Sequence, residues 1–274
     1  MDELSELTDG KLDVQCNDRF GRKIMRNLIA SAVCLLALTM TALAQDATHA
    51  PHWGYSGKEG PNAWGSLKPE YKLCQSGKQQ SPINIKDAKK DSLPVIQFDY
   101  KSAALNVVNN GHTIQVTYPS GSFITVGDKK YELKQFHFHH PSEEEVNGKG
   151  YDMVAHLVHA DADGRLAVVA VLLRKGAANP MLQKIWEKMP KEEGPAREVA
   201  GVEVNAAALL PSSRAYYTFP GSLTTPPCSE GVTWFVLKTP SEISAEEIET
   251  FSKIYSHNAR PVQPANERVI LESQ

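Results

Sequence analysis

Seven short runs of β-branched and aromatic residues follow one another through the middle of the chain, and this series limits the fold more than any other feature. Gly, Pro, Asn and Asp separate the runs, as is typical of strands joined by turns. The last run is apolar on both faces, which indicates a strand in the middle of a sheet. The runs cover residues 95–98, 104–108, 113–118, 123–126, 131–139, 154–160 and 166–173.

Two helices are indicated after these strands. Asn179 followed by Pro180 is typical of a helix start, and apolar residues recur behind it at helical spacing. Ser244 with Glu247 three residues later predicts a capping box at the start of a second helix. Because strands outnumber helices, we expect a mostly β fold with peripheral helices.

The N-terminal part of the chain is set apart from this pattern. Residues 25–44 combine a basic start, an apolar run over 28–43 and a small-residue motif ending at Ala44, which together predict a signal peptide. The apolar run is shorter than the ~20 residues of a bilayer span, so we expect cleavage and export, with a periplasmic location; a membrane anchor is the alternative. We interpret residues 1–24 as an upstream extension without structure, and 45–274 as one domain.

Charge and cysteines limit the partners and the compartment. Residues 1–44 hold five basic and six acidic side chains, so the totals of 29 and 32 become 24 and 26 without them. This near-neutral balance gives no electrostatic argument for nucleic acid or an anionic membrane. Cys74 and Cys228 remain as an even pair in an exported chain, which is typical of a disulfide; two free thiols are the alternative.

Three histidines are spaced as metal ligands would be. His137 and His139 are two apart in a strand pattern and therefore project from one face, and His156 lies in the next predicted strand, which hairpin-like pairing would bring beside them. Three neutral imidazoles with an open fourth position describe a catalytic zinc site. A His-x-His pair taken alone is often a chance surface feature. His140 and His159 have the opposite parity, so we expect neither to be a ligand.

Six segments, in the same order, resemble the α-carbonic anhydrase family. The resemblance runs through nearly the whole chain after residue 44, and it implies a single domain on a large, twisted, mainly antiparallel sheet whose conical cleft ends at Zn²⁺. The segments are Gln79–Ile85, Asn109–His112, Gln135–His139, His156–His159, Ser222–Pro227, and Asn258 with Arg260-Pro261.

The resemblance also implies the site residues. His137, His139 and His156 match the zinc ligands, and Gln135 and the main chain of Asn258 match the groups that hold the first two.

Further matches concern the chemistry around the metal. Thr224 matches the acceptor of a hydrogen bond from the zinc-bound hydroxide, and Glu143 matches the group that orients Thr224. His112 matches the proton shuttle, with a turn histidine after Gly111 as the alternative. The remaining matches are Tyr55, Asn110 and Thr225 around ordered water, Val158, Val168, Leu223 and Trp234 lining the carbon dioxide site beside Thr224 and Thr225, and Cys74 with Cys228 as a disulfide.

The activity implied by the resemblance is the reversible hydration of carbon dioxide to bicarbonate and a proton, by attack of zinc-bound hydroxide. The expected partners are these small molecules, without nucleic acid and without a membrane once the signal peptide is removed, and a homodimer stays open. Two alternatives are a non-catalytic binding module, which intact ligands with Glu143 and Thr224 argue against, and a zinc hydrolase acting on esters.

Two positions depart from the family pattern. Many members carry a Glu two residues before the third ligand, where it accepts that ligand's second N–H, and here the position is Val154. Glu144 stands where many members have His. Because a ligand imidazole normally donates its second N–H, water or another group must serve His156, and Asp152 is one candidate by parity.

Overall fold

The structure is a computed structural model that describes residues 52–274. The predicted extension over 1–24 and the predicted signal peptide over 25–44 lie outside the described residues. None of the helices in the described part of the chain is long and apolar enough to cross a membrane.

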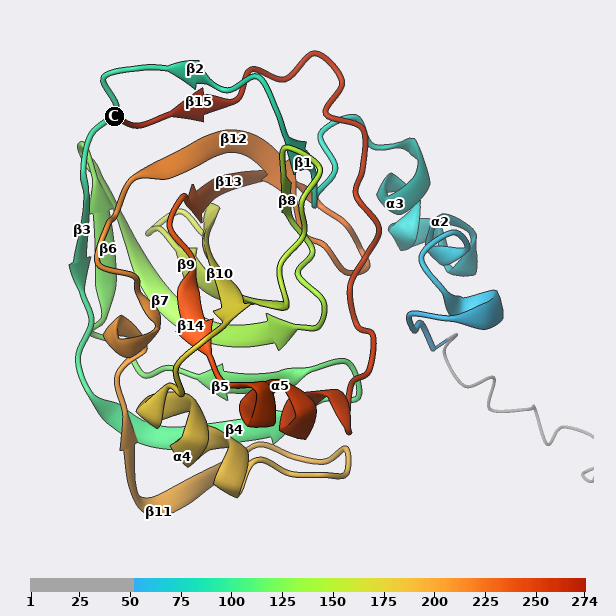
Figure 1. Cartoon of the computed structure of the whole chain (residues 1–274). Coiled ribbons are helices and arrows are strands. Elements are labelled where there is room, and N and C mark those ends of the chain that lie inside the picture. The colour runs from blue at the N-terminus through green and yellow to red at the C-terminus, as the bar shows by residue number, and fades with distance from the viewer. Residues whose placement is uncertain (1–51) are drawn as a thin grey trace, which may run out of the picture. The chain divides into compact units, whose positions relative to one another are not determined.

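A sheet of 13 strands dominates the described residues (Figure 1). Its central path runs β11-β4-β5-β7-β9-β10-β13-β12-β15-β2, with β14 beside β10, β6 beside β7, and β3 beside β6. Most neighbours are antiparallel, and β10 pairs with β13 in parallel. The bounds are β2 Lys89–Lys90, β3 Ile96–Asp99, β4 Ala103–Asn109, β5 Ile114–Thr117, β6 Phe123–Val126, β7 Lys129–His139, β9 Met153–Ala160, β10 Leu166–Lys175, β11 Arg197–Val204, β12 Tyr216–Ser222, β13 Glu230–Leu237, β14 Ser241–Ile243 and β15 Leu271–Glu272.

The predicted strand series is confirmed. The seven runs correspond to β3, β4, β5, β6, β7, β9 and β10, and a turn at Asp161–Gly164 joins the last two. Two further strands, β1 (Asn84–Ile85) and β8 (Glu145–Val146), form a separate parallel pair. The described part is therefore mostly β, as expected.

Both predicted helices are present, α4 at Pro180–Lys188 and α5 at Ala245–Ser252. The Asn179 side chain accepts from the first backbone N–H groups of α4, and Ser244 forms the predicted capping box with Glu247. Glu247 also accepts a hydrogen bond from the backbone N–H of Asn179 at 3.1 Å. The residues that start the two helices therefore also connect them, and α4 and α5 lie side by side (Figure 1).

The segment before the first strand forms short helices. These are η1 (Gly57–Glu59), α2 (Trp64–Leu67), η2 (Pro69–Tyr71) and α3 (Leu73–Ser76), and η3 (Ala206–Leu209) follows β11. The Trp64 side chain is fully buried, and its indole N–H donates to the carbonyl oxygens of Gly54 and Glu59.

A disulfide joins Cys74 of α3 to Cys228, which lies 154 residues further along the chain. The predicted pairing is confirmed, and the alternative of two free thiols is wrong. The bond fixes the N-terminal helices to the loop between β12 and β13.

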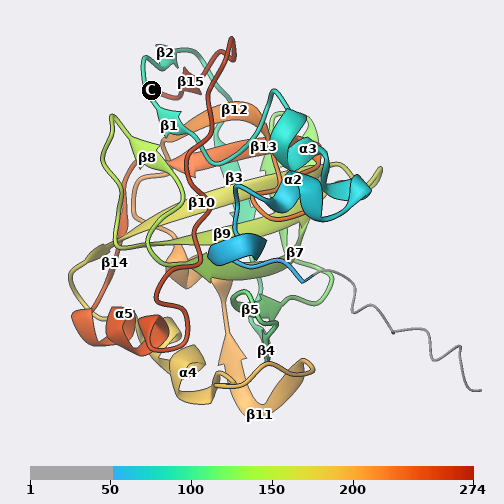
Figure 2. The same ribbon diagram turned by 90° about the vertical axis from the view of Figure 1, so that its right-hand side faces the viewer.

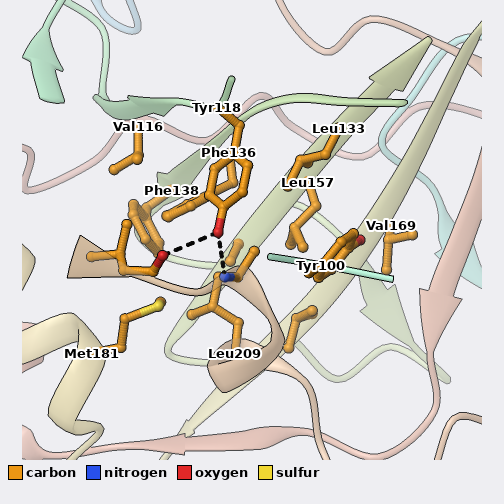
Figure 3. Packing of buried hydrophobic residues seen from close by; sticks show 14 of the residues in the cluster. Tyr100, Val116, Tyr118, Leu133, Phe136, Phe138, Leu157, Val169, Met181 and Leu209 are labelled. Atoms are coloured by element: carbon orange, nitrogen blue, oxygen red, sulfur yellow. Dashed lines mark hydrogen bonds between the residues drawn. The ribbon is translucent and has the colours of Figure 1, made fainter. Parts of the chain in front are cut away.

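Strand alternation divides the buried apolar residues into two main clusters. Phe136 and Phe138 of β7 and Leu157 of β9 belong to the larger cluster (Figure 3). Apolar side chains of α4 and α5 also belong to it. In that cluster the Tyr118 hydroxyl lies 2.8 Å from the carbonyl oxygen of Lys101 and 3.2 Å from that of Val204, and it accepts from the backbone N–H of Ala206. On β7 and β9, the residues that alternate with Phe136, Phe138 and Leu157 project from the opposite face of the sheet.

His159 lies in the larger cluster, on the face that its parity predicts. It is fully buried, and its Nε2 is 2.8 Å from the Tyr100 hydroxyl. Burial lowers the pKa of His159 to about 3. The unfolded chain takes up this proton near pH 6.5 and the folded chain only near pH 3, so folding stability is lost as the pH falls through this interval.

We expect His159→Gln, which keeps an acceptor for the Tyr100 hydroxyl, to make the unfolding free energy less sensitive to acid. Between pH 7.5 and pH 5 the wild-type protein should lose about 2 kcal/mol more of its unfolding free energy than the variant. Urea unfolding at both pH values measures the difference. Parallel pH profiles for the two proteins would contradict the assignment.

Candidate metal centre

The three predicted ligands meet because of the register between two central strands. β7 and β9 are neighbouring strands (Figure 2) that pair antiparallel. In this register His137 stands directly opposite His156. His139 lies two residues after His137 and therefore shares its face. The His139 ring centroid is 5.1 Å from that of His137 and 4.7 Å from that of His156. One nitrogen of each ring lies within 4.8 Å of the others.

The orientation of the first two rings is set by hydrogen-bond acceptors. His137 Nδ1 is 2.8 Å from the amide oxygen of Gln135, and His139 Nδ1 is 2.7 Å from the carbonyl oxygen of Asn258. Because both oxygens accept, each Nδ1 carries the proton and each Nε2 keeps its lone pair for a metal. Gln135 and Asn258 thus lie where the resemblance implies.

The third ring is held the other way round, by a residue that the sequence did not identify. His156 Nε2 is 2.9 Å from Glu144 Oε1 and 3.2 Å from Oε2, so Nδ1 is the nitrogen that faces the centre. Burial lowers the pKa of His156, but the adjacent Glu144 carboxylate reverses this and the net shift is upward. Glu144 is therefore the acceptor that Val154 does not provide.

The suggested role of Asp152 is wrong. Its carboxylate accepts from the backbone N–H of Lys175 at 2.7 Å, away from the ligands. Val154 is fully buried among apolar side chains. The two departures from the family pattern are thus connected, because Glu144 supplies the acceptor that the apolar Val154 side chain cannot. This pairing was the signal in the sequence that would have found Glu144.

The donor set fits Zn²⁺. His139 Nε2 is buried and has no hydrogen-bond partner among the described residues, and the nearest carboxylate oxygen, Oε2 of Glu143, is 3.4 Å away. Loss of hydration, with a smaller effect of His156, lowers the pKa of His137 to about 3, and burial lowers that of His139 strongly. Both rings are therefore neutral at pH 7, as zinc ligands must be. Three imidazole nitrogens leave a fourth position open.

Glu143 is fixed beside the ligands and close to Thr224. Its Oε1 accepts from the backbone N–H of Arg260 at 2.7 Å. Burial raises the pKa of Glu143 to about 8, while His156, the Arg260 N–H and the Thr224 side chain act in the opposite direction. Thr224 is itself buried, and its side chain lies close enough to Glu143 to affect the pKa of that carboxyl. A bound dication would favour the ionised carboxylate further.

His112 lies in an aromatic stack. Its ring centroid is 3.6 Å from that of Trp53 at an interplanar angle of 10°, and the exposed His52 ring is stacked 5.3 Å away. Burial, and secondarily His52, lowers the pKa of His112 to about 4. Its carbonyl oxygen accepts from the Asn258 side chain at 2.9 Å. Asn258 therefore connects the loop of His112 to the ligand His139.

The residues expected around ordered water have clear structural contacts of their own. Tyr55 packs edge-on against Trp53 and Trp64, and burial and the nearby Glu143 raise its pKa. The Asn110 side chain accepts from the backbone N–H of His112 at 3.0 Å. Thr225 is partly buried, and its carbonyl oxygen accepts from the backbone N–H of Cys228 at 2.8 Å.

The four apolar residues expected at the substrate site come together on the ligand face. All belong to the second apolar cluster, apart from the larger cluster that includes side chains of α4 and α5. The Trp234 ring meets the His156 ring edge-on at 5.0 Å. The four are Val158, Val168, Leu223 and Trp234.

Comparison with known proteins agrees with this arrangement. Residues 59–274 match the family model for eukaryotic-type carbonic anhydrase. A carbonic anhydrase of Neisseria gonorrhoeae is 46% identical over 256 residues, which cover 93% of this chain and 99% of that protein. One of Nostoc sp. (strain PCC 7120 / SAG 25.82 / UTEX 2576) is 45% identical over 227 residues, covering 81% and 86%.

Among solved structures, the alpha-carbonic anhydrase of Thermovibrio ammonificans in complex with the inhibitor sulfanilamide is 49% identical. It superposes with a TM-score of 0.78, covering 81% of this chain and 99% of that one. The chain therefore belongs to the eukaryotic-type, or alpha, carbonic anhydrase family.

Proposed function

We propose that this protein is a zinc enzyme that reversibly hydrates carbon dioxide to bicarbonate and a proton. The observation that carries the proposal is the convergence of three ligand nitrogens, each on a ring whose other nitrogen faces an acceptor. Zn²⁺ bound to them supplies a Lewis acid that makes hydroxide available near neutral pH, a property known of carbonic anhydrases.

Glu143 and Thr224 set the direction in which the nucleophile points. The Glu143 carboxylate is fixed through the backbone N–H of Arg260. Its Oε2 has no hydrogen-bond partner among the described residues, and we expect the nearby Thr224 hydroxyl to donate to this carboxylate in the working enzyme. A hydroxyl that donates to a carboxylate has only its lone pairs left. Thr224 therefore accepts a hydrogen bond from the attacking oxygen and orients that oxygen toward the carbon of the substrate.

The apolar lining holds carbon dioxide beside the ligands. Val168 and Trp234 are almost fully buried, and Val158 and Leu223 are partly buried beside them. Such a surface binds an uncharged linear molecule without competing for its oxygen atoms. It holds the charged product less well, which favours release of bicarbonate.

His112 carries the proton that the reaction leaves behind, with Tyr55, Asn110 and Thr225 around the water between it and the metal. At pH 7 its ring is neutral, which is the form that accepts a proton. A pKa of about 4 is low for this task, because acid–base groups work best near the operating pH. While it is stacked on Trp53, the His112 ring therefore gives up a proton to solvent more readily than it accepts one. We expect the ring to accept the proton in a position away from Trp53.

We expect His112→Ala to lower turnover by about 100-fold, the lower end of the range for positioned acid–base groups. Imidazole added to the buffer should restore most of the loss, because it replaces the missing ring. Zinc content should not change, since the His112 side chain contacts no ligand. A variant with wild-type turnover in dilute buffer would make His112 a turn residue only.

The compartment follows from the same proposal. The Cys74–Cys228 disulfide forms and persists in an oxidising environment. Together with the sequence pattern over 25–44, it supports export to the periplasm.

Rates with two substrates separate this proposal from its alternatives. We expect the zinc-loaded protein to hydrate carbon dioxide far faster than it cleaves an activated ester such as 4-nitrophenyl acetate. A preference for the ester would favour a zinc hydrolase. Inertness toward both substrates with zinc bound would favour a binding module.

A further inference from the structure

The carboxylate of Glu144 has a single hydrogen-bonding contact among the described residues, the Nε2 of His156. Both of its oxygens lie within 3.2 Å of that nitrogen. The side chain of Glu144 is fully buried, and a second buried carboxylate, Glu143, is its neighbour in the chain. Burying a carboxylate that has a single hydrogen-bond partner lowers the stability of the fold. This cost indicates that the contact with His156 serves the site.

The contact fixes the tautomer of His156. The ring can bind a metal through Nδ1 only when Nε2 holds the proton, and a carboxylate on Nε2 fixes that form and makes Nδ1 a stronger donor. His137 and His139 use neutral oxygens for the corresponding task. His156 is therefore the one ligand of the three whose acceptor is a carboxylate.

Strand geometry gives a second place from which a carboxylate can reach the same ring. Residue 154 is two positions before His156 on β9, so their side chains share a face. In this chain the position holds Val154, which belongs to the same buried apolar cluster as Ile85 and Val168. The acceptor comes instead from Glu144, in the turn that leads into β8.

We infer that Glu144 is the positioning residue of the third ligand and takes the place of a carboxylate at position 154. This inference rests on the proposed zinc site. It makes retention of the metal depend on the segment between β7 and β8 as well as on the two strands that carry the ligands.

The test is zinc affinity, measured on the full chain by competition with a chromophoric chelator. We expect Glu144→Ala to bind Zn²⁺ about 10–100-fold more weakly than wild type. Glu144→Gln, which keeps an oxygen acceptor of similar size, should lose less than the alanine variant. Glu145→Ala is the matched control, because its backbone pairs with Asn84 and its side chain makes no ligand contact among the described residues.

A second experiment moves the carboxylate from position 144 to position 154. Adding Val154→Glu to Glu144→Ala should restore zinc affinity to within about threefold of wild type, because the new side chain shares the face of His156. The visible spectrum with Co²⁺ in place of zinc should move in Glu144→Ala and return in the double variant. If Glu144→Ala acted only by disturbing the fold, neither the zinc affinity nor the Co²⁺ spectrum would recover in the double variant.

Wild-type zinc affinity in Glu144→Ala would overturn the inference, and so would a double variant that folds but does not recover. If the alanine variant does not fold, the glutamine variant carries the test, and unchanged affinity there with an unchanged Co²⁺ spectrum would also overturn it. Failure of the proposed function has a different signature, namely a wild-type protein that holds zinc tightly and does not hydrate carbon dioxide.

Discussion

His139→Ala removes zinc from the protein and abolishes carbon dioxide hydration, and this is the largest effect we expect. The ring is 1% exposed, its Nδ1 is held by the carbonyl oxygen of Asn258, and its Nε2 has no other partner among the described residues. Its loss leaves two imidazoles, too few for the three protein ligands of a catalytic zinc site. Metal analysis of the purified variant and stopped-flow hydration assays measure both effects.

The neighbouring histidine is the matched control. His140 lies on the opposite side of the strand end, with its Nδ1 2.9 Å from the carbonyl oxygen of Ser256. We expect His140→Ala to keep one zinc per chain and most of the activity. Equal losses in the two variants would show that the region is sensitive to any change and would remove the support for a specific ligand.

Thr224→Ala is the second large effect, and it separates chemistry from metal binding. The variant keeps all three ligands but loses the hydroxyl that lies beside Glu143. We expect kcat/KM for hydration to fall about 100- to 1,000-fold, the range seen when one preorganised hydrogen-bonding group is removed from a transition state. Zinc content should stay at the wild-type level.

Thr224→Ser tests the same point conservatively. It restores the hydroxyl without the methyl group, so we expect activity within about tenfold of wild type. If serine were as inactive as alanine, packing rather than the hydrogen bond would explain the loss. If alanine were as active as wild type, Thr224 would have no part in the reaction.

Much of the fold followed from local patterns. The β-branched runs predicted seven strands because alternation and bounding turns are local properties, and the caps at Asn179 and Ser244 were predicted for the same reason. The ligand face followed from the parity of His137, His139 and His156, which needs only the period of a strand. The roles of individual site residues came from the family resemblance rather than from these patterns.

Contacts between distant segments could not be predicted in this way. The parity of His156 gives the face of its ring but not the group that meets Nε2, which depends on the path of the chain between β7 and β9. Asp152 shares that parity, yet it turns to the backbone of Lys175. The stack of Trp53 on His112 joins segments 59 residues apart, and no local pattern reports it.

The most direct test of the account is a single preparation of residues 45–274 in which zinc content and the carbon dioxide hydration rate are both measured. We predict one zinc per chain and fast hydration, with both lost when the metal is removed by a chelator and both regained on adding Zn²⁺. A well-folded protein that contains zinc at three histidines and does not hydrate carbon dioxide would contradict the proposed function, and one that binds no zinc would contradict the metal centre itself.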